Sequence, residues 1–415
     1  MIAPSYSDLT RVFGRIGLLS FGGPAAQIAL MHRELVEERP WLSEDQFLRA
    51  LSLCMLLPGP EAMQLATYAG WRLRGTWGGL IAGGLFIIPG ALVVLALALI
   101  YAVLGDVPVV QAAFTGIKAA VIVIVLQALC KVAGKALQTP AAWALAIFAF
   151  IALFALGLPY PLIVLAAGLC GALLLPRPKV PDEPTKNVIA QPAKTLLIWG
   201  SLWSAPVLAI WIADQAFLVQ IALFFSKLAV VTFGGAYAVL AYMTQTIVTD
   251  YGWVTTEQMI DALGLAETTP GPLILVTEFV ALLAGYAQGG LALALAAGAL
   301  TLWVTFIPCF LWIFLAGPYL DSLATRPRLS AALSGITAAV VGVILNLALW
   351  FGMHVLFRDT VDTTWLAAPL PLLSSIDPAA VTLTLLATLL LIGLKRGIVQ
   401  TLIIMATAGW IGSLL

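Results

Sequence analysis

The sequence predicts an all-α polytopic membrane protein, built from two repeats of inverted topology with broken helices and about 13 hydrophobic segments. The 415 residues are 62% hydrophobic and only 10% charged, whereas soluble domains are about 25% charged. The mean hydropathy is +1.05. Glycine and proline motifs also recur in the same order at an offset of 212 residues. Composition therefore predicts the membrane class, and the spacing predicts the duplication.

Hydrophobic segments lie on both sides of one hydrophilic linker. They fall at about 7–31, 46–70, 78–104, 112–130, 140–157, 159–175, 195–213, 217–244, 258–285, 289–317, 330–351, 379–394 and 397–415. A crossing helix needs about 20 apolar residues, so the pairs 140–175 and 379–415 could be short or re-entrant hairpins. The predicted organisation is a first repeat over 1–175, a cytoplasmic linker over 176–194, a connecting transmembrane helix over 195–215 and a second repeat over 216–415.

Loop charges orient these segments. With the N-terminus in the cytoplasm, most basic loop residues lie inside, as the positive-inside rule requires. The exceptions are Arg33, Arg39, Arg49, Arg358 and Lys227. The unmatched span 195–213 gives the second repeat the opposite orientation, which predicts repeats related by an axis in the membrane plane. If that span did not cross, the repeats would be parallel, an arrangement that the loop charges do not favour.

Three landmarks define the repeat. Phe21-Gly22-Gly23 recurs as Phe233-Gly234-Gly235, Trp41 as Trp253, and Pro58-Gly59-Pro60 as Pro270-Gly271-Pro272. Ser43 with Gln46 and Thr255 with Gln258 also match, and each pair is typical of a capping box at a helix start. Further along, Gly116 and Gly335 match at an offset of 219. Landmarks that keep one register favour duplication over coincidence.

The glycine and proline breaks predict helix starts inside the membrane. Glycine permits backbone angles that other residues avoid, and Pro24 suits the first position of a new helix. A helix N-terminus carries free N–H groups and partial positive charge, so it favours anions. Paired breaks in two halves are typical of transporter binding sites. Four converging N-termini predict a pocket for a compact oxyanion.

Polar side chains accompany the breaks. Arg15 matches Lys227 and Ser20 matches Thr232, whereas Lys118 matches the neutral Thr337. A cation at a membrane centre costs about 3 kcal/mol, which favours a function. The candidate substrate-binding residues are Arg15, Ser20, Gly22, Gly23, Pro24, Pro58, Gly59, Pro60, Glu61, Lys118, Lys227, Thr232, Gly234, Gly235, Pro270, Gly271 and Pro272.

Each charged candidate also has a structural interpretation. Arg15 and Lys227 could anchor helix ends by snorkelling, and Lys118 could belong to a salt bridge. Glu61 could carry a proton or cation, or pair with one of these bases. Its repeat partner is Leu273, so we expect an asymmetric pocket in which the first half carries more of the chemistry.

Other functional classes are disfavoured. The four cysteines are scattered and only two histidines occur, so we expect no metal site and no cofactor. No basic run points to nucleic acid. An enzyme would gather its acid, base and thiol groups at one membrane face, whereas the candidate polar groups straddle both halves. We therefore expect a transporter rather than an enzyme.

The motifs resemble the chromate ion transporter (CHR) family. The resemblance is carried by residues 21–26, 41–44, 56–61 and 70–75 in the first half and by 232–237, 251–253 and 269–272 in the second. It is similar to the long, two-domain form. The resemblance implies chromate efflux across the cell inner membrane, conferring resistance, with sulfate as the competing anion. The expected partners are chromate or sulfate and membrane lipid, with a homodimer as a further option.

Overall fold

The computed structural model describes residues 4–21, 23–105, 107–176, 191–233, 236–319, 327–361, 363 and 366–414. The α-helices are α1 (Tyr6–Leu19), α2 (Gly23–His32), α3 (Glu44–Leu56), α4 (Glu61–Leu104), α5 (Pro108–Ala136), α6 (Pro140–Phe154), α7 (Tyr160–Leu174), α8 (Pro192–Ile212), α9 (Ala216–Val231), α10 (Ala236–Gln245), α11 (Thr256–Thr268), α12 (Val276–Ala316), α14 (Pro327–Leu356), α15 (Pro378–Thr388) and α16 (Ile398–Gly412). The π-helical turns are η1 (Arg33–Glu37), η2 (Thr246–Asp250) and η6 (Leu389–Gly393), and the 3-10 turns are η3 (Leu273–Leu275), η4 (Gly317–Tyr319) and η5 (Leu373–Ser375). Two short antiparallel strands, β1 (Thr360–Val361) and β2 (Leu370–Pro371), complete the described part. The helical fold agrees with the prediction.

Among the residues that the structure describes, five helical segments are long and apolar enough to cross a membrane. They are Glu61–Leu104, Pro108–Ala136, Pro192–Ile212, Leu273–Tyr319 and Pro327–Leu356. Helices α6, α7 and α16 have 15 residues each, about 22 Å of helix against a hydrocarbon layer of about 30 Å. The chain is thus a multi-pass membrane protein, whereas the count of 13 segments and the inverted topology stay predictions.

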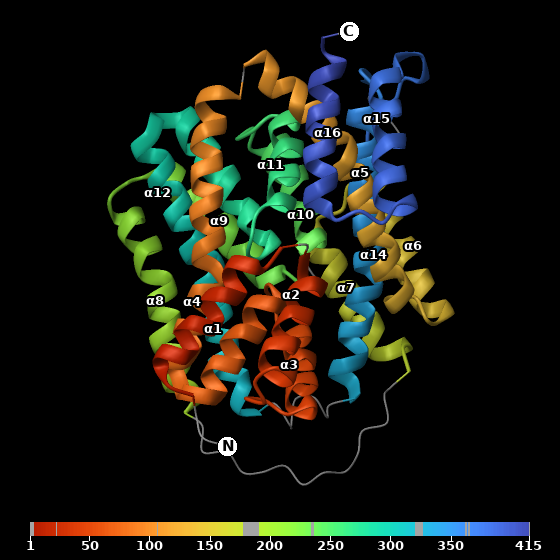
Figure 1. Cartoon of the computed structure of the whole chain (residues 1–415). Helices are drawn as coiled ribbons and strands as arrows, with labels where there is room; N and C mark the ends of the chain where they lie inside the picture. Colours follow the sequence, from red (N-terminus) through yellow and green to blue (C-terminus); the bar gives the residue numbers. More distant parts are fainter. Residues whose placement is uncertain are drawn as a thin grey trace. The chain divides into compact units, whose positions relative to one another are not determined.

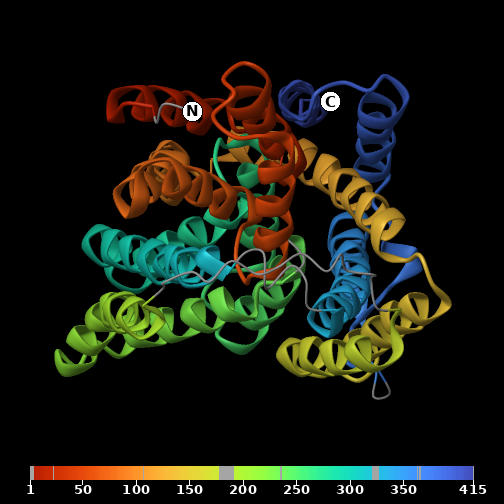
Figure 2. The same ribbon diagram turned by 90° about the horizontal axis from the view of Figure 1, so that it is seen from below.

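The chain forms two compact units, and each unit draws on both halves of the sequence. Unit 1 contains Met1–Leu99, Lys179–Ala236 and Thr269–Pro327, and unit 2 contains the remainder. Within unit 1, α12 packs against both α8 and α9 (Figure 1). Within unit 2, α5 packs against α11, α15 and α16, and Figure 2 shows α5 near the two C-terminal helices.

Glycine contacts in unit 2 pair the halves reciprocally. A Cβ atom on Gly116 of α5 would lie 1.8 Å from the carbonyl oxygen of Met405 on α16, and one on Gly335 of α14 would lie 2.6 Å from the Cα of Gly171 on α7. Small residues allow such close approach of membrane helices. Gly116 and Gly335 are the repeat partners noted above. A contact that recurs with the roles of the two halves exchanged is what an approximate two-fold relation produces.

Helices α4 and α12 are each a tight helical hairpin. The backbone leaves the helical region at Arg74–Gly75 and at Gly289–Gly290, where the second residue has a φ of 65° and 71° respectively. A Cβ on Gly70 would lie 2.2 Å from the carbonyl oxygen of Gly78, so the chain doubles back on itself. The predicted gap between segments 46–70 and 78–104 contains the first turn, and the gap between 258–285 and 289–317 lies directly before the second turn.

The breaks also reverse the chain within unit 1. Arg74 Nε donates to the carbonyl oxygen of Pro4 at 2.5 Å, and a hollow of about 240 Å³ is lined jointly by Pro4, Arg11, Arg39 and their neighbours. The N-terminus, the turn after α2 and the turn at residue 74 therefore lie at one end of the unit. The chain therefore reverses between α1 and α2 and again between α3 and α4, so the predicted stretches 7–31 and 46–70 each contain a reversal.

Candidate functional site

The glycine and proline breaks of the two halves meet in unit 1. The Gly59 N–H donates to the carbonyl oxygen of Thr232, and the Gly271 N–H donates to the carbonyl oxygen of Ser20, both at 2.9 Å. Ser20 and Thr232 are repeat partners, as are Gly59 and Gly271. Each Pro-Gly-Pro turn is thus bonded to the residue before the Phe-Gly-Gly motif of the other half. We call this pair of reciprocal contacts the crossing.

The crossing requires glycine at both turns. Gly59 has a φ of +126° and Gly271 a φ of +87°, a region that side chains disfavour. A Cβ on Gly59 would lie 2.7 Å from Gln64 Nε2 and 2.9 Å from Cys309 Sγ. The second Pro-Gly-Pro turn is also closely packed, because a Cβ on Gly90 would lie 2.2 Å from the carbonyl oxygen of Pro270. The sequence pattern therefore reflects close backbone packing at this point.

The two predicted hydroxyl groups bond to their own helices. Ser20 Oγ donates to the carbonyl oxygen of Ile16, and Thr232 Oγ1 donates to that of Leu228, both at 2.6 Å. Both side chains are buried. Here the contribution of Ser20 and Thr232 to the crossing comes from their backbone carbonyl groups.

Two amide side chains from the first half complete the crossing. Gln27 Nε2 donates to the carbonyl oxygens of Gly271 at 2.7 Å and Ser20 at 3.2 Å. Gln64 Nε2 donates to the carbonyl oxygen of Pro58 at 2.7 Å. The Oε1 atom of each is buried without a hydrogen-bond partner. Gln27 is not among the site residues predicted from the sequence, although an amide side chain one turn into the helix that follows a break is a recognisable signal.

The helix N-termini at the breaks are not equivalent. Helix α2 begins at Gly23, which has a φ of +78°, and its first turn includes Pro24 and the exposed Ala25 and Ala26. Helix α4 begins after Pro60 with Glu61, whose carboxylate favours the same partial positive charge that would attract an anion. After Pro272 the chain enters the buried 3-10 turn η3 before α12 starts. The predicted residues Gly22, Gly234 and Gly235 lie outside the described residues.

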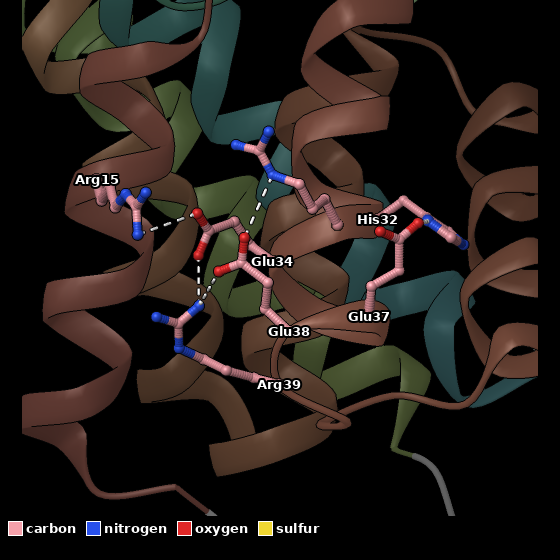
Figure 3. A network of polar contacts seen from close by, with 7 residues as sticks. Arg15, His32, Glu34, Glu37, Glu38 and Arg39 are labelled. Atoms are coloured by element: carbon pink, nitrogen blue, oxygen red, sulfur yellow. Dashed lines mark hydrogen bonds and ion pairs between the residues drawn. The ribbon is translucent and has the colours of Figure 1, made fainter.

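Arg15 belongs to an ion-pair network at the end of unit 1 (Figure 3). The fully buried Glu34 lies between two arginines, 3.4 Å from Arg15 and 2.5 Å from Arg39. Arg39 also approaches Glu38 at 3.4 Å, and Arg33 pairs with Glu38 at 3.5 Å. The charge of Arg15 is thus balanced by a carboxylate. Its repeat partner Lys227 is exposed on α9.

Lys118 lies in unit 2 and pairs with a buried carboxylate. Its Nζ is 3.4 Å from Asp261 Oδ1, and the Tyr101 hydroxyl donates to Asp261 Oδ2 at 2.7 Å. One turn and a half further along α11, the Tyr237 hydroxyl donates to Glu267 Oε1 at 2.7 Å. This arrangement agrees with the salt-bridge interpretation of Lys118. Asp261 was not among the candidates; its signal is a carboxylate within a mostly apolar segment.

A family model and several related proteins all match this chain to chromate transporters. The family model for chromate transporters matches residues 7–172 and 219–413, one region in each half. The chain is 34% identical to a probable chromate transport protein of Synechococcus elongatus, over 85% of this chain and 86% of that protein. It is also 34% identical to the chromate transport protein of Pseudomonas aeruginosa, over 82% of this chain and 79% of that protein.

A third relative is the chromate transport protein of Cupriavidus metallidurans, 33% identical over 82% of each chain. No solved structure matches the chain. The family match covers both halves, including the residues of the crossing, and the relatives span nearly the same length. This chain therefore belongs to the chromate transporter family.

Proposed function

We propose that this protein exports chromate across the cell inner membrane by alternating access around the crossing. The single observation that carries this proposal is the reciprocal pair of hydrogen bonds, Gly59 to Thr232 and Gly271 to Ser20. Non-helical backbone at membrane depth is tolerated only where protein buries it or where it lines a cavity. Two such breaks that bond to each other give the halves a shared pivot.

The anion site of this proposal is the N-terminal turn of α2. Its first N–H groups have no partner within the helix, and the exposed Ala25 and Ala26 leave them accessible. Gln27 fixes the turn against Gly271. The other described breaks are less suited to bind an anion. The Glu61 carboxylate offsets the partial positive charge at the N-terminus of α4, and the 3-10 turn η3 separates Pro272 from the start of α12. The first half thus supplies the anion site, and the second half supplies part of its support.

The energetics favour export. A charge that crosses a membrane gains about 2.3 kcal/mol per 100 mV, so a dianion leaving a cell that is negative inside gains about 4.6 kcal/mol. Membrane potential or a proton gradient is the proposed driving force. The proposed orientation has the N-terminus in the cytoplasm, with the two repeats inverted. Arg11, Arg39 and Arg74 support it, because they gather at the N-terminal end of unit 1 and basic residues favour the cytoplasmic side.

Everted membrane vesicles test this function, because they accumulate an exported anion. We expect energised vesicles that contain the parent chain to accumulate chromate. Gly23→Ala is expected to reduce the initial rate about tenfold, a barrier change of about 1.4 kcal/mol, because it strains the start of α2. Gly75→Ala is the matched control: Gly75 also has a positive φ, 65°, and a Cβ on either residue would meet open space. Equal rates for the two variants would contradict the site.

Sulfate is the alternative substrate, since a second tetrahedral dianion offers a helix N-terminus the same target. The same vesicles separate the two. We expect labelled chromate to accumulate and unlabelled sulfate to compete only when in excess. Accumulation of sulfate with no accumulation of chromate would assign the protein to sulfate instead.

A further inference from the structure

A second polar feature of unit 1 lies inside the α12 hairpin. Glu278, in its first limb, is 3% exposed, and its Oε2 atom is buried without a hydrogen-bond partner. No ion pair found in the described part of the chain includes Glu278. A buried carboxylate that pairs with no cation of the described residues is costly to keep charged. Intramembrane carboxylates of this kind mark functional sites by default.

The way the two limbs of the α12 hairpin pack shows which residues of the second limb lie level with Glu278 of the first. Gly285 packs against Ala294, and Gly298 packs against Leu282. One turn further from the hairpin bend, Glu278 and Thr301 lie at the same level on the two limbs. Thr301 Oγ1 and, one turn on, Thr305 Oγ1 are also buried without partners. Several helical threonines bond to a carbonyl of the preceding turn, as Thr337 does, whereas Thr301 and Thr305 do not, like the buried Thr244 and Thr401 elsewhere in the chain.

These groups lead to the crossing. Thr301, Thr305 and Cys309 are spaced four residues apart, so they share one face of the second limb. Cys309 Sγ is bonded to the Thr305 carbonyl oxygen at 3.2 Å and lies beside Gly59. Gln64, whose Oε1 also lacks a partner, adjoins the same glycine. A row of buried, unsatisfied oxygen atoms thus runs from Glu278 to the first Pro-Gly-Pro turn.

We propose that Glu278 is the proton-binding site that couples proton entry to anion export, with Thr301 and Thr305 as the path to the crossing. Protonation removes the buried charge and gives Oε2 or Oε1 a hydrogen that a threonine oxygen can accept. Release of that proton requires water to reach the carboxylate in another conformation. This inference rests on the proposed function, and it assigns the coupling ion and its residue.

Other ionisable groups on the surrounding elements do not neutralise Glu278. The titratable residues on α8, α9, the unit 1 part of α4 and α12 itself with its η4 end are Lys194, Lys227, Glu61, Tyr68, Arg72, Arg74, Tyr286, Cys309 and Tyr319. No hydrogen bond or ion pair between described residues joins any of them to Glu278. The proposal therefore assigns the positive charge at this carboxylate to a bound proton. One entering proton per departing dianion also raises the charge moved per cycle from two to three.

The test uses purified full-length protein in proteoliposomes, with the potential clamped at zero by potassium and valinomycin. Both pH values are kept above the range in which chromate takes up a proton. A difference of one pH unit is expected to sustain an about tenfold chromate gradient in the parent, for one proton exchanged per anion. Glu278→Gln is expected to sustain no gradient while chromate–chromate exchange continues. Asp214→Asn, which removes an exposed carboxylate of unit 1, is expected to match the parent.

The other possible results of this experiment also support or overturn the proton site at Glu278. A Glu278→Gln protein that sustains the parent's gradient overturns the proposal, and so does a parent gradient that follows sodium instead of protons. If Glu278→Gln also loses exchange, Thr301→Val decides: slower proton-driven accumulation with normal exchange supports the path, and equal loss of both overturns it. A parent that exchanges chromate but ignores the pH difference overturns the proton site alone. A parent that exchanges neither chromate nor sulfate overturns the proposed function itself.

Discussion

The segment 23–56 of the first half and the segment 236–268 of the second have the same order of helices and turns, but they carry different charged side chains. Each contains a short helix, a π-helical turn and a second helix that starts with a capping box. Trp41 N–H donates to the Leu35 carbonyl oxygen at 3.1 Å, and Trp253 N–H donates to that of Ile247 at 3.0 Å. Both predicted capping boxes are confirmed, with Ser43 and Gln46 in one and Thr255 and Gln258 in the other.

Charged side chains lie in different places in the two segments. In the first, the buried Glu34 lies in the turn and pairs with arginines. In the second, Asp261 and Glu267 are buried within α11 and accept hydrogen bonds from tyrosines. Backbone hydrogen bonds preserve a scaffold whatever the side chains do, so duplication fixes the architecture while each copy can acquire its own chemistry.

The largest effect is expected when the buried pair of the second segment is broken. Lys118→Met leaves Asp261 charged and without its cation, which typically costs about 3 kcal/mol. The measurement is the free energy of unfolding in detergent. Lys135→Met, at an exposed site on the same helix, is the control and is expected to be nearly neutral. The double variant Lys118→Met/Asp261→Asn should recover most of the loss, and no recovery would contradict a direct pair.

A smaller effect is expected at the crossing. Gly59→Ala places a Cβ against Gln64 and Cys309 at a φ of +126°, which costs about 2 kcal/mol in strain. Gly271→Ala meets Leu275 at 3.1 Å and Gly90 at 3.4 Å, at a φ of +87°, so its loss of stability and of transport should be less. Thermal unfolding and vesicle transport check this order. A larger loss for Gly271→Ala than for Gly59→Ala would show that the close contacts of the two glycines do not determine the cost of a side chain there.

The network at the turn of the first segment is expected to respond less. Arg39→Ala should lower stability by about 1 kcal/mol, because it removes the shorter contact to Glu34 while Arg15 still balances the charge. Arg15→Ala removes the 3.4 Å contact of a residue that is 51% exposed, so its effect should be smaller. Thermal unfolding ranks the two. Equal losses would mean that distance and exposure do not govern this network.

The sequence predicted the helical membrane class, the duplication, the capping boxes and the glycine turns, because each depends on local residue types. It did not predict that the chain reverses between α1 and α2 and between α3 and α4. A glycine–proline break permits both a kink and a reversal, and tertiary contacts such as that between Pro4 and Arg74 decide between them. Gln27 and Glu278 were missed for a related reason, since their importance comes from partners, or missing partners, that are distant in the sequence.

The smallest expected effect is the pH dependence that His32 gives to the first segment. His32 Nε2 is 2.7 Å from Glu44 and Nδ1 is 3.0 Å from Glu37. The hydrogen bond to Glu44, followed by its charge and by Glu37, raises the pKa of His32 above its ordinary value. The imidazolium is favoured in the folded state, so this stabilisation is complete below the unfolded pKa of about 6.5 and is lost as the pH rises through the higher folded pKa.

His32→Phe keeps a ring beside Phe47, whose centroid is 5.1 Å from that of His32. The parent should unfold at a higher temperature than this variant near pH 5.5, by an amount equivalent to less than about 1 kcal/mol because the partners Glu37 and Glu44 are exposed, and the difference should vanish near pH 8.5. The repeat partner is the buried Thr244, so Thr244→Val should shift the unfolding temperature equally at both pH values. If the difference between the parent and His32→Phe did not change with pH, the charge of His32 would not contribute to stability and only the packing of its ring would.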